Sequence, residues 1–202
     1  MNTIKSATRS LIISNAKELF LLKSINEVTI YDIAKKAGIG EATVYRYFKN
    51  KLNLVIETAV EMSKDVYEAY FKFSENEKGY DIISKFYNSF YLIFKYHMEF
   101  FSFINEFDSF LVSSDSYDSI DYETSVLQFK NLYDKAYEKG IYDGTIKAQE
   151  DPDTFYYATT HSLLSLCKKL AVRKNILEND KLVSKEEELK MMINIILNQI
   201  KM

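Results

Sequence analysis

The scarcity of proline and glycine constrains this chain more than any other feature of its sequence. Its 202 residues include 1 proline and 5 glycines. Tight turns and β-bulges depend on these two residue types, so a chain with so few of them favours long helices joined by few loops. Lys, Glu, Leu, Ile and Ala also recur at helical spacing through most of the chain. We therefore expect an all-α fold with about nine helices.

Charge is distributed unevenly along the chain. The formal net charge is −3, yet residues 1–60 hold nine Lys or Arg against five Asp or Glu, a balance of +4, and the rest carries −7. A basic N-terminal segment on an acidic body is typical of a DNA-binding module joined to a domain with another role. An excess of this size also arises by chance, so the prediction does not rest on it alone.

Cysteine content and hydropathy favour a cytoplasmic protein. Cys167 is the only cysteine, so an internal disulfide is excluded, as expected in a reducing compartment. No apolar run reaches the roughly 18 residues that a membrane-spanning helix needs. Polar residues follow Met1 closely, which argues against a signal peptide. We expect no membrane partner.

Residues 29–38 predict a short helix with well-marked ends. Thr29 is expected to cap a helix over residues 30–37, and Asp32 at its third position favours the positive end of the helix dipole. Gly38 is expected to end this helix, because glycine adopts the left-handed backbone at little cost.

A second short helix is expected at residues 40–49, after the turn Gly38-Ile39-Gly40. With a preceding helix over about residues 8–23, this pattern predicts a helix-turn-helix, whose second helix enters the DNA major groove. Val44 is expected to face the small core. The residues left facing outward are Glu41, Ala42, Thr43, Tyr45 and Arg46.

The remaining helices follow from apolar periodicity and from capping residues. Asn50 is expected to cap a long helix, Gly140 to stop another, and Asp151-Pro152 to start the next. The expected ranges are about 51–73, 80–95, 98–111, 120–139, 152–174 and 184–201.

Three N-terminal segments resemble the signature of the tetracycline-repressor (TetR) family: Ala16–Phe20, Val28–Ile39 and Thr43–Lys51. Their order and spacing match over about residues 8–58, and the run Tyr-Arg-Tyr-Phe-Lys-Asn-Lys after the glycine turn is the most specific part. The resemblance implies a dimeric bacterial transcription regulator. It also implies a helix-turn-helix DNA-binding domain at residues 1–50 and a ligand-sensing and dimerisation domain at 51–202.

The resemblance implies which side chains meet DNA. Thr29 and Thr43 would approach phosphates, and Thr43 also a base. Tyr45 would donate a hydrogen bond from its hydroxyl to a phosphate. The ammonium of Lys51 would also contact a phosphate, together with the dipole of the helix that Lys51 begins. Arg46 suits either a guanine edge or a phosphate. The full predicted DNA-binding set is Thr29, Gly40, Glu41, Ala42, Thr43, Tyr45, Arg46, Tyr47, Lys49 and Lys51.

Some positions leave alternatives open. Gly40 stands where the family often has a side-chain cap, and Glu41 where a Lys is common. Glu41 either accepts from a cytosine amino group or only stabilises the N-terminus of its helix. Tyr47 either packs at the end of the helix or reaches the DNA backbone, whereas Phe48 is expected in the core.

The body carries two further predicted sites. Residues 86–110 are unusually aromatic, and they either wall a pocket for an apolar or aromatic effector or fill an aromatic core. By family analogy, the candidate ligand-binding residues are Phe90, Phe94, His97, Phe101, Phe129 and Tyr133. The last two helices of each subunit are expected to form a four-helix bundle across the dimer interface. The alternative is that their apolar faces are buried within one subunit. The candidate interface residues are Phe155, Ser162, Leu166, Leu170, Ile193, Ile196, Leu197 and Ile200.

These features predict a ligand-released repressor that binds a palindromic operator as a homodimer. A ligand between the middle helices would shift the fourth helix and tilt the DNA-binding segment. The alternative is a helical small-molecule-binding protein of the same fold that has lost DNA binding.

An enzyme is not expected, because the Gly38-Ile39-Gly40 run lacks the third glycine of a dinucleotide fingerprint. No cofactor is expected. Two distant histidines and one cysteine do not suit a zinc site.

Overall fold

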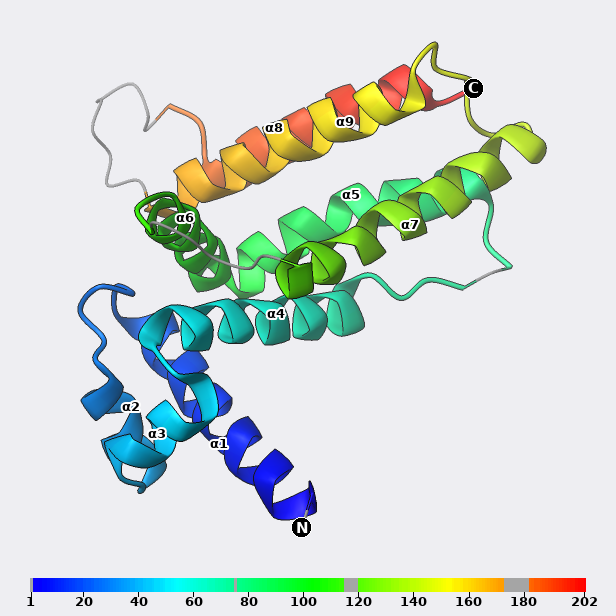
Figure 1. Cartoon of the computed structure of the whole chain (residues 1–202). Helices are drawn as coiled ribbons and strands as arrows, with labels where there is room; N and C mark the ends of the chain where they lie inside the picture. The colour runs from blue at the N-terminus through cyan, green and yellow to red at the C-terminus, as the bar shows by residue number, and fades with distance from the viewer. Residues whose placement is uncertain (1, 75, 115–119, 173–181) are drawn as a thin grey trace. The chain divides into compact units, whose positions relative to one another are not determined.

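The computed structural model describes residues 2–74, 76–114, 120–172 and 182–202, and over these residues it is all-α, as predicted (Figure 1). The only pairing of extended backbone in the described ranges is an isolated bridge between Ile146 and Lys201. The helices are α1 (Asn2–Leu22), α2 (Ile30–Ala37), α3 (Glu41–Phe48), α4 (Lys51–Tyr70), α5 (Gly79–Tyr96), α6 (Met98–Val112), α7 (Ile120–Tyr142), α8 (Pro152–Val172) and α9 (Lys185–Ile200).

The chain divides into two compact units. The head consists of Met1–Asp65 and Ser102–Ser125, and the body consists of Val66–Phe101 and Val126–Met202. The division falls inside α4, α6 and α7, so three helices contribute residues to both units. The head therefore contains more of the chain than residues 1–50.

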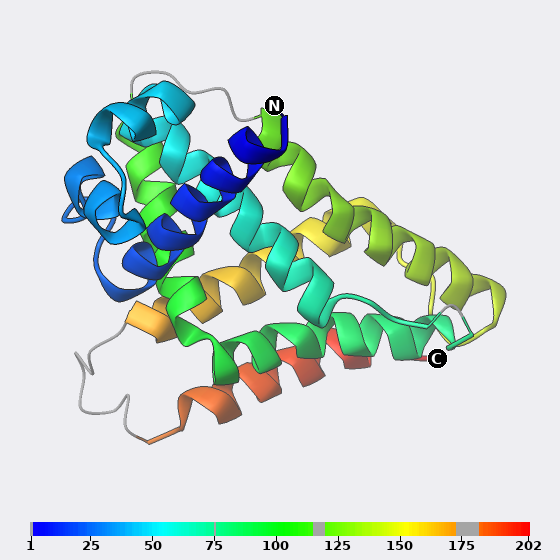
Figure 2. The ribbon, with the colours of Figure 1, turned by 90° about the horizontal axis from the view of Figure 1, so that it is seen from below.

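The head has its own apolar core, to which the long helix α1 and the short helices α2 and α3 contribute. In Figure 2, α2 and α3 lie side by side next to α1, and contacts join α1 to α2 and α2 to α3. The ring of Phe20 on α1 stacks on that of Phe103 on α6, with 6.1 Å between centroids. The first helix begins at Asn2 and not near residue 8, and the side chains of residues 4–7 in its added turn are exposed. Apolar periodicity does not detect such a turn.

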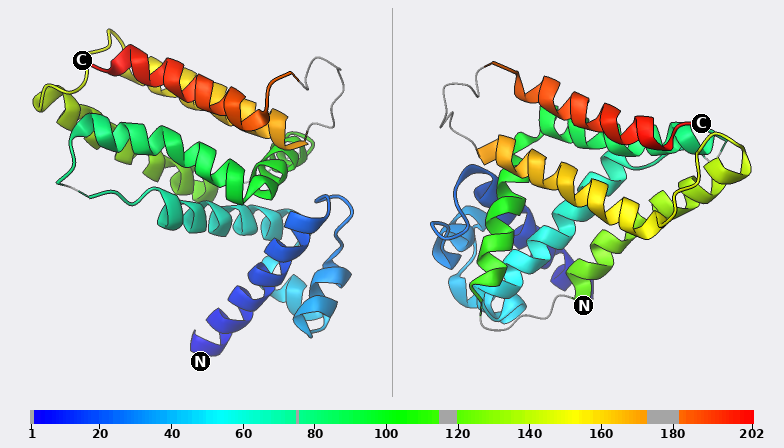
Figure 3. Two further views of the ribbon diagram at one scale, coloured as in Figure 1. Left: turned by 180° about the vertical axis from the view of Figure 1, so that it is seen from behind. Right: turned by 90° about the horizontal axis from the view of Figure 1, so that it is seen from above.

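The body is a layered packing of α5, α7, α8 and α9 around one hydrophobic core. Helix α9 packs against both α5 and α8, as Figure 3 shows from two sides. Fully buried residues from all four helices meet in this core: Ile83, Phe86, Tyr133, Leu163, Cys167, Leu189 and Ile193. None of the described helices is long and apolar enough to cross a membrane.

The sequence suggested that Gly140 stops its helix. In the structure it lies inside α7, which continues to Tyr142. A Cβ at Gly79, the first residue of α5, would clash with the backbone of Gly140, and a Cβ at Gly140 would clash with the side chain of Ile146. Gly79 therefore allows the close approach of α5 to α7, and Gly140 allows the side chain of Ile146 to pack against α7. The N–H of Gly79 also donates to the carboxylate of Asp143 at 2.9 Å, which caps α5 from a distant segment.

Candidate DNA interface and ligand-binding core

A reciprocal cap fixes the start of α2. The hydroxyl of Thr29 accepts from the Asp32 N–H at 3.1 Å, and the Asp32 carboxylate accepts from the Thr29 N–H at 2.9 Å. The hydrogen bond that the Asp32 carboxylate accepts from the Thr29 hydroxyl, together with the one from the Thr29 N–H, holds the pKa of Asp32 below its ordinary value. The prediction that Thr29 caps this helix is confirmed. Because the Thr29 hydroxyl also donates to Asp32 at 2.6 Å, its contact with a phosphate stays a prediction.

The turn between α2 and α3 depends on the backbone of Gly38. This residue has φ 69° and ψ 30°, a left-handed conformation that favours glycine. The reversal lets the Ile39 N–H donate to the Ala34 carbonyl at 3.0 Å, which satisfies the end of α2. Gly40 follows with φ −79° and ψ 149° as the N-cap of α3, and it supplies no side-chain hydrogen bond.

Helix α3 is anchored by two residues and presents the others outward. Val44 and Phe48 are 0% and 1% exposed, one helical turn apart on the inner face. Tyr45 is 49% exposed. The prediction that Val44 faces the core is confirmed. The outer residues of α3 are Glu41, Ala42, Tyr45 and Arg46, which are exposed, and Thr43 and Tyr47, which are half-buried.

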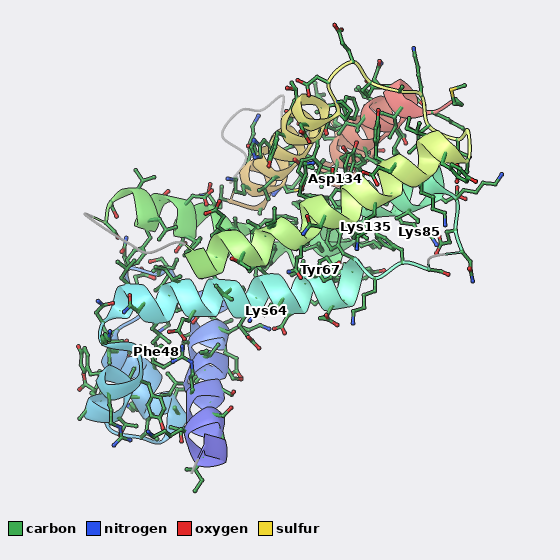
Figure 4. The ribbon with its side chains drawn as sticks, turned by 45° about the vertical axis from the view of Figure 1, so that its right-hand side comes forward. Phe48, Lys64, Tyr67, Lys85, Asp134 and Lys135 are labelled. Carbon is green, nitrogen blue, oxygen red and sulfur yellow. The ribbon has the colours of Figure 1, made fainter. Side chains whose placement is uncertain are left out.

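Arg9 holds the end of α3 in place, a role that the sequence did not indicate. Its guanidinium lies 5.0 Å from the centroid of the Phe48 ring, which Figure 4 labels within the head. The same guanidinium forms an ion pair with Glu57 on α4. A single cation thus contacts α3 and α4 from α1, and it fixes the recognition helix relative to the first turns of α4.

The junction of α3 and α4 exposes Lys49 and engages Lys51. Lys49 has φ 65°, a conformation that costs a non-glycine residue about 1–3 kcal/mol and needs support from its surroundings. Its N–H donates to the Tyr45 carbonyl at 2.8 Å. The side chain of Asn50 accepts from the Asn53 N–H at 2.8 Å, so the predicted cap of α4 is confirmed.

Lys51 is half-buried, and its ammonium has contacts within the head. It donates to the Asn26 carbonyl at 3.4 Å and lies 6.0 Å from the Phe110 ring centroid. Burial lowers its pKa, and the charge of Asp32 opposes that effect. Nearby, the Glu106 carboxylate on α6 accepts from the Ile25 N–H at 2.7 Å. Both groups brace the loop between α1 and α2, and a phosphate contact by Lys51 stays a prediction.

The described geometry is that of a helix-turn-helix with an outward recognition helix, and a comparison with family models agrees with it. Residues 12–58 match the model of "Bacterial regulatory proteins, tetR family". Over this segment, about a quarter of the chain, the protein is similar to the N-terminal domain of the tetR family. Members of this family are transcriptional regulators and not enzymes, and the helix-turn-helix is their DNA-binding element. A comparison with curated protein sequences gives no match.

Solved structures share the fold of this protein over nearly the whole chain. The fatty acid degradation regulator FadR from Bacillus halodurans has a TM-score of 0.70 at 15% identity and covers 94% of each chain. A TetR-family regulator from Marinobacter aquaeolei VT8 has a TM-score of 0.63 at 19% identity, covering 100% of this chain and 99% of its own. RolR in complex with resorcinol has a TM-score of 0.65 at 15% identity, covering 99% and 90%. At these identities the likeness concerns the fold alone.

Three of the six candidate ligand residues of the regulator meet in one aromatic cluster of the body. Phe129 lies 4.8 Å and Phe90 lies 6.1 Å from the ring of Phe71, and Tyr133 lies 5.6 Å from that of Phe86. Phe71 was missed, because it lies beyond α4 and outside the aromatic run. Tyr67 on α4, labelled in Figure 4, points toward α7 and meets Phe129 edge-on at 5.3 Å.

The other three candidates lie elsewhere in the body. Phe94 and Phe101 are buried against each other with centroids 6.4 Å apart. His97 is exposed at the end of α5, 5.8 Å from the ring of Tyr70 and 3.6 Å from the carboxylate of Glu99. Phe94 also borders a solvent-open hollow of about 410 Å³ between the end of α5 and the start of α9. The six residues therefore do not line one site.

The candidate dimer residues divide between the core and the surface. Phe155 and Leu166 are half-buried and Ser162 is exposed, all on α8. The other five pack inside the chain's own hydrophobic core: Leu170, Ile193, Ile196, Leu197 and Ile200. The outward faces of α8 and α9 carry different apolar side chains, among them Tyr157, Met191 and Ile195. A core and an interface both favour an apolar stripe, so periodicity alone does not distinguish them.

Proposed function

We propose that this regulator is a repressor that binds a palindromic operator in the cytoplasm as a homodimer and is released by a small apolar or aromatic effector. The observation that carries the proposal is the outer face of α3, where Tyr45 and Arg46 are exposed while Val44 and Phe48 hold the helix. Guanidinium and phenol groups suit phosphates and base edges. The exposed Lys49 adds a cation at the end of the same helix.

The geometry of DNA supports a dimer. One recognition helix of eight residues reaches only a few base pairs, so two copies on successive major grooves supply the affinity and the palindromic preference. The face proposed to meet the second copy is the outward side of α8 and α9. Met191 is 62% exposed and Ile195 is 52% exposed on α9, which is unusual for large apolar residues unless a partner covers them.

The body supports an effector role. It holds an aromatic cluster of the kind that binds small apolar molecules. RolR, which shares the fold, was solved with resorcinol, a small phenol. Helix α4 contributes residues to both the head and the body, so a ligand that changes the packing around Tyr67 acts on a helix that also carries head residues. A release of 100-fold requires the ligand to favour the non-binding state by about 2.7 kcal/mol.

The operator is found by selecting bound sequences from a pool of random duplexes with purified full-length protein. The expected result is an enriched palindrome whose half-sites lie about one helical turn, or 10 base pairs, apart. Arg46→Ala is expected to relax the preference at one position of each half-site. Enrichment of no sequence by the wild type would overturn the repressor proposal in favour of a helical small-molecule-binding protein that has lost DNA binding.

The dimer face is tested separately by sedimentation velocity. Met191→Glu and Ile195→Glu place a charge in the proposed interface and are expected to shift the protein from dimer to monomer. Leu127→Glu is the matched control, because Leu127 on α7 is also exposed and apolar but lies outside the face. If all three variants stay dimeric, the interface lies elsewhere.

A further inference from the structure

Tyr133 lies at the centre of the body's aromatic cluster. It is 1% exposed, and rings from three helices surround it. The Tyr156 ring lies 4.8 Å away, the Phe86 ring 5.6 Å, the Tyr87 ring 6.1 Å and the Tyr137 ring 6.2 Å. These separations are typical of favourable edge-on and stacked ring pairs. The ring of Tyr133 is therefore a fully packed member of the core.

The hydroxyl of Tyr133 is the exception within this packing. It is buried and makes no hydrogen bond of ordinary length among the described residues, and its one hydroxyl neighbour is the longer-range contact with Tyr87. The neighbouring tyrosines do have partners: the Tyr87 hydroxyl bonds with that of Thr159 at 2.6 Å, and the Tyr137 hydroxyl accepts from the Gln149 N–H at 2.7 Å. A buried hydroxyl without a good hydrogen bond is destabilising, so phenylalanine would be the better residue for packing alone.

The hydroxyl of Tyr133 remains a donor at neutral pH. Burial, with a smaller contribution from Tyr87, raises the pKa of Tyr133 far above the usual tyrosine value. A group that stays protonated offers its proton to an acceptor and does not attract a cation. The residue therefore favours a partner with an acceptor oxygen or nitrogen.

The charges near the cluster are already paired. The Lys130 ammonium lies 5.2 Å from the Tyr156 ring centroid, and its ion pairs are with Asp134 at 2.5 Å and Asp153 at 2.7 Å. Figure 4 labels Asp134 on α7. A charged ligand entering the cluster would lose its hydration without gaining an unpaired counter-charge among these groups, which is strongly unfavourable.

We propose that Tyr133 donates a hydrogen bond to the effector, which is an uncharged small aromatic molecule with one acceptor group, such as an aryl ketone or a phenol. The half-buried rings of Phe90 and Phe129 at the edge of the cluster turn aside as the ligand ring takes over their contacts with Phe71. This inference rests on the proposed effector role of the body and specifies the chemistry of that site.

The test compares two probes of the same shape, acetophenone and α-methylstyrene. Acetophenone has a carbonyl oxygen where α-methylstyrene has a methylene group. Their affinities for full-length wild type and for Tyr133→Phe are measured by titration calorimetry. Wild type is expected to bind acetophenone about 3- to 10-fold more tightly than α-methylstyrene, the range of one net hydrogen bond. In Tyr133→Phe this preference disappears, while the affinity for α-methylstyrene is unchanged.

Stability of the free protein provides an independent readout. Tyr133→Phe is expected to leave the urea midpoint equal or higher, because it removes an unsatisfied group, whereas Tyr137→Phe lowers it by leaving the Gln149 N–H unpaired. A destabilised Tyr133→Phe whose probe preference is unchanged would show that a buried water satisfies the hydroxyl, and would overturn the inference. Failure of both probes to bind would overturn it as well. DNA selection with the same protein samples shows separately whether the regulator proposal stands.

Discussion

Gly38 and Gly40 form a matched pair of sites within the helix-turn-helix. A Cβ added at either position would meet no atom within 4 Å, so added bulk is tolerated equally at both. The backbones differ, because Gly38 has a φ of 69° and Gly40 has a φ of −79°. Substituting serine at both sites adds the same atoms, and any difference in stability then reports the backbone conformation of the turn.

The two substitutions are expected to change stability in opposite directions. Gly38→Ser places a side chain in the left-handed region, at a cost of about 1–2 kcal/mol. Gly40→Ser restricts the unfolded chain, which is worth about 0.4–1 kcal/mol, and adds the missing cap of α3, which is worth a few tenths of a kcal/mol. Because both substitutions restrict the unfolded chain equally, that contribution cancels, and the free energies of unfolding of the two variants should differ by about 1–2.5 kcal/mol.

Urea denaturation followed by circular dichroism measures this difference. With a denaturant slope of about 1–3 kcal/mol per molar urea, the two midpoints should lie on the order of 1 M apart, on either side of the wild type. All three proteins must be compared at one concentration, because the proposed dimer would make the measured stability depend on it. Equal shifts in the same direction would refute the turn geometry and the assignment of Gly40 as an uncapped N-cap.

Three further predictions follow from single contacts. Burial raises the pKa of the Cys167 thiol to about 12, so a disulfide reagent should modify the native protein far more slowly than the urea-unfolded protein, and rapid native labelling would contradict this burial. Asp32 has a lowered native pKa, so its contribution to the free energy of unfolding is complete above the unfolded pKa of about 3.9 and is lost as pH falls through the native pKa. Asp32→Asn should therefore flatten the fall of the urea midpoint between pH 5 and 3, as measured by parallel titrations in about 0.5-unit pH steps. Glu106→Gln weakens the bond to the Ile25 N–H, so hydrogen exchange of that amide should accelerate, and an unchanged rate would contradict the contact.

Local sequence rules located most helix ends, because the groups that cap a helix lie next to it in the chain. The Asp151 carboxylate accepts from the Thr154 N–H at 3.0 Å and starts α8, as the Asp-Pro pair predicted. The same rules failed at Gly140, where the glycine serves a contact with a distant segment and not the end of a helix. Distant contacts leave no local pattern, so this role was not predictable.

The candidate sites show the same limit. The outward face of α3 was predictable, because one buried residue and the helical period fix the direction of the others. The pairing of Arg9 with Phe48 and Glu57 was not, since these residues come from three helices. In the body, aromatic content indicated a cluster but not its members, and the stripe on α9 was equally consistent with a core or an interface. The burial of Ile193 and Ile196 assigns those two residues to the core of the chain, and the dimer stays a prediction.

The central claim is that the outer face of α3 and the residues beside it bind DNA. The most direct test is a fluorescence-anisotropy titration of the selected duplex across a salt series, with wild type, Lys49→Ala and Lys147→Ala. Lys147 is an exposed cation of the body, so its variant removes the same charge away from the interface. If the claim holds, Lys49→Ala weakens binding and lowers the logarithmic salt slope by about 2 per dimer, one phosphate contact from each copy, while Lys147→Ala matches the wild type. Identical slopes for the two variants would contradict the claim.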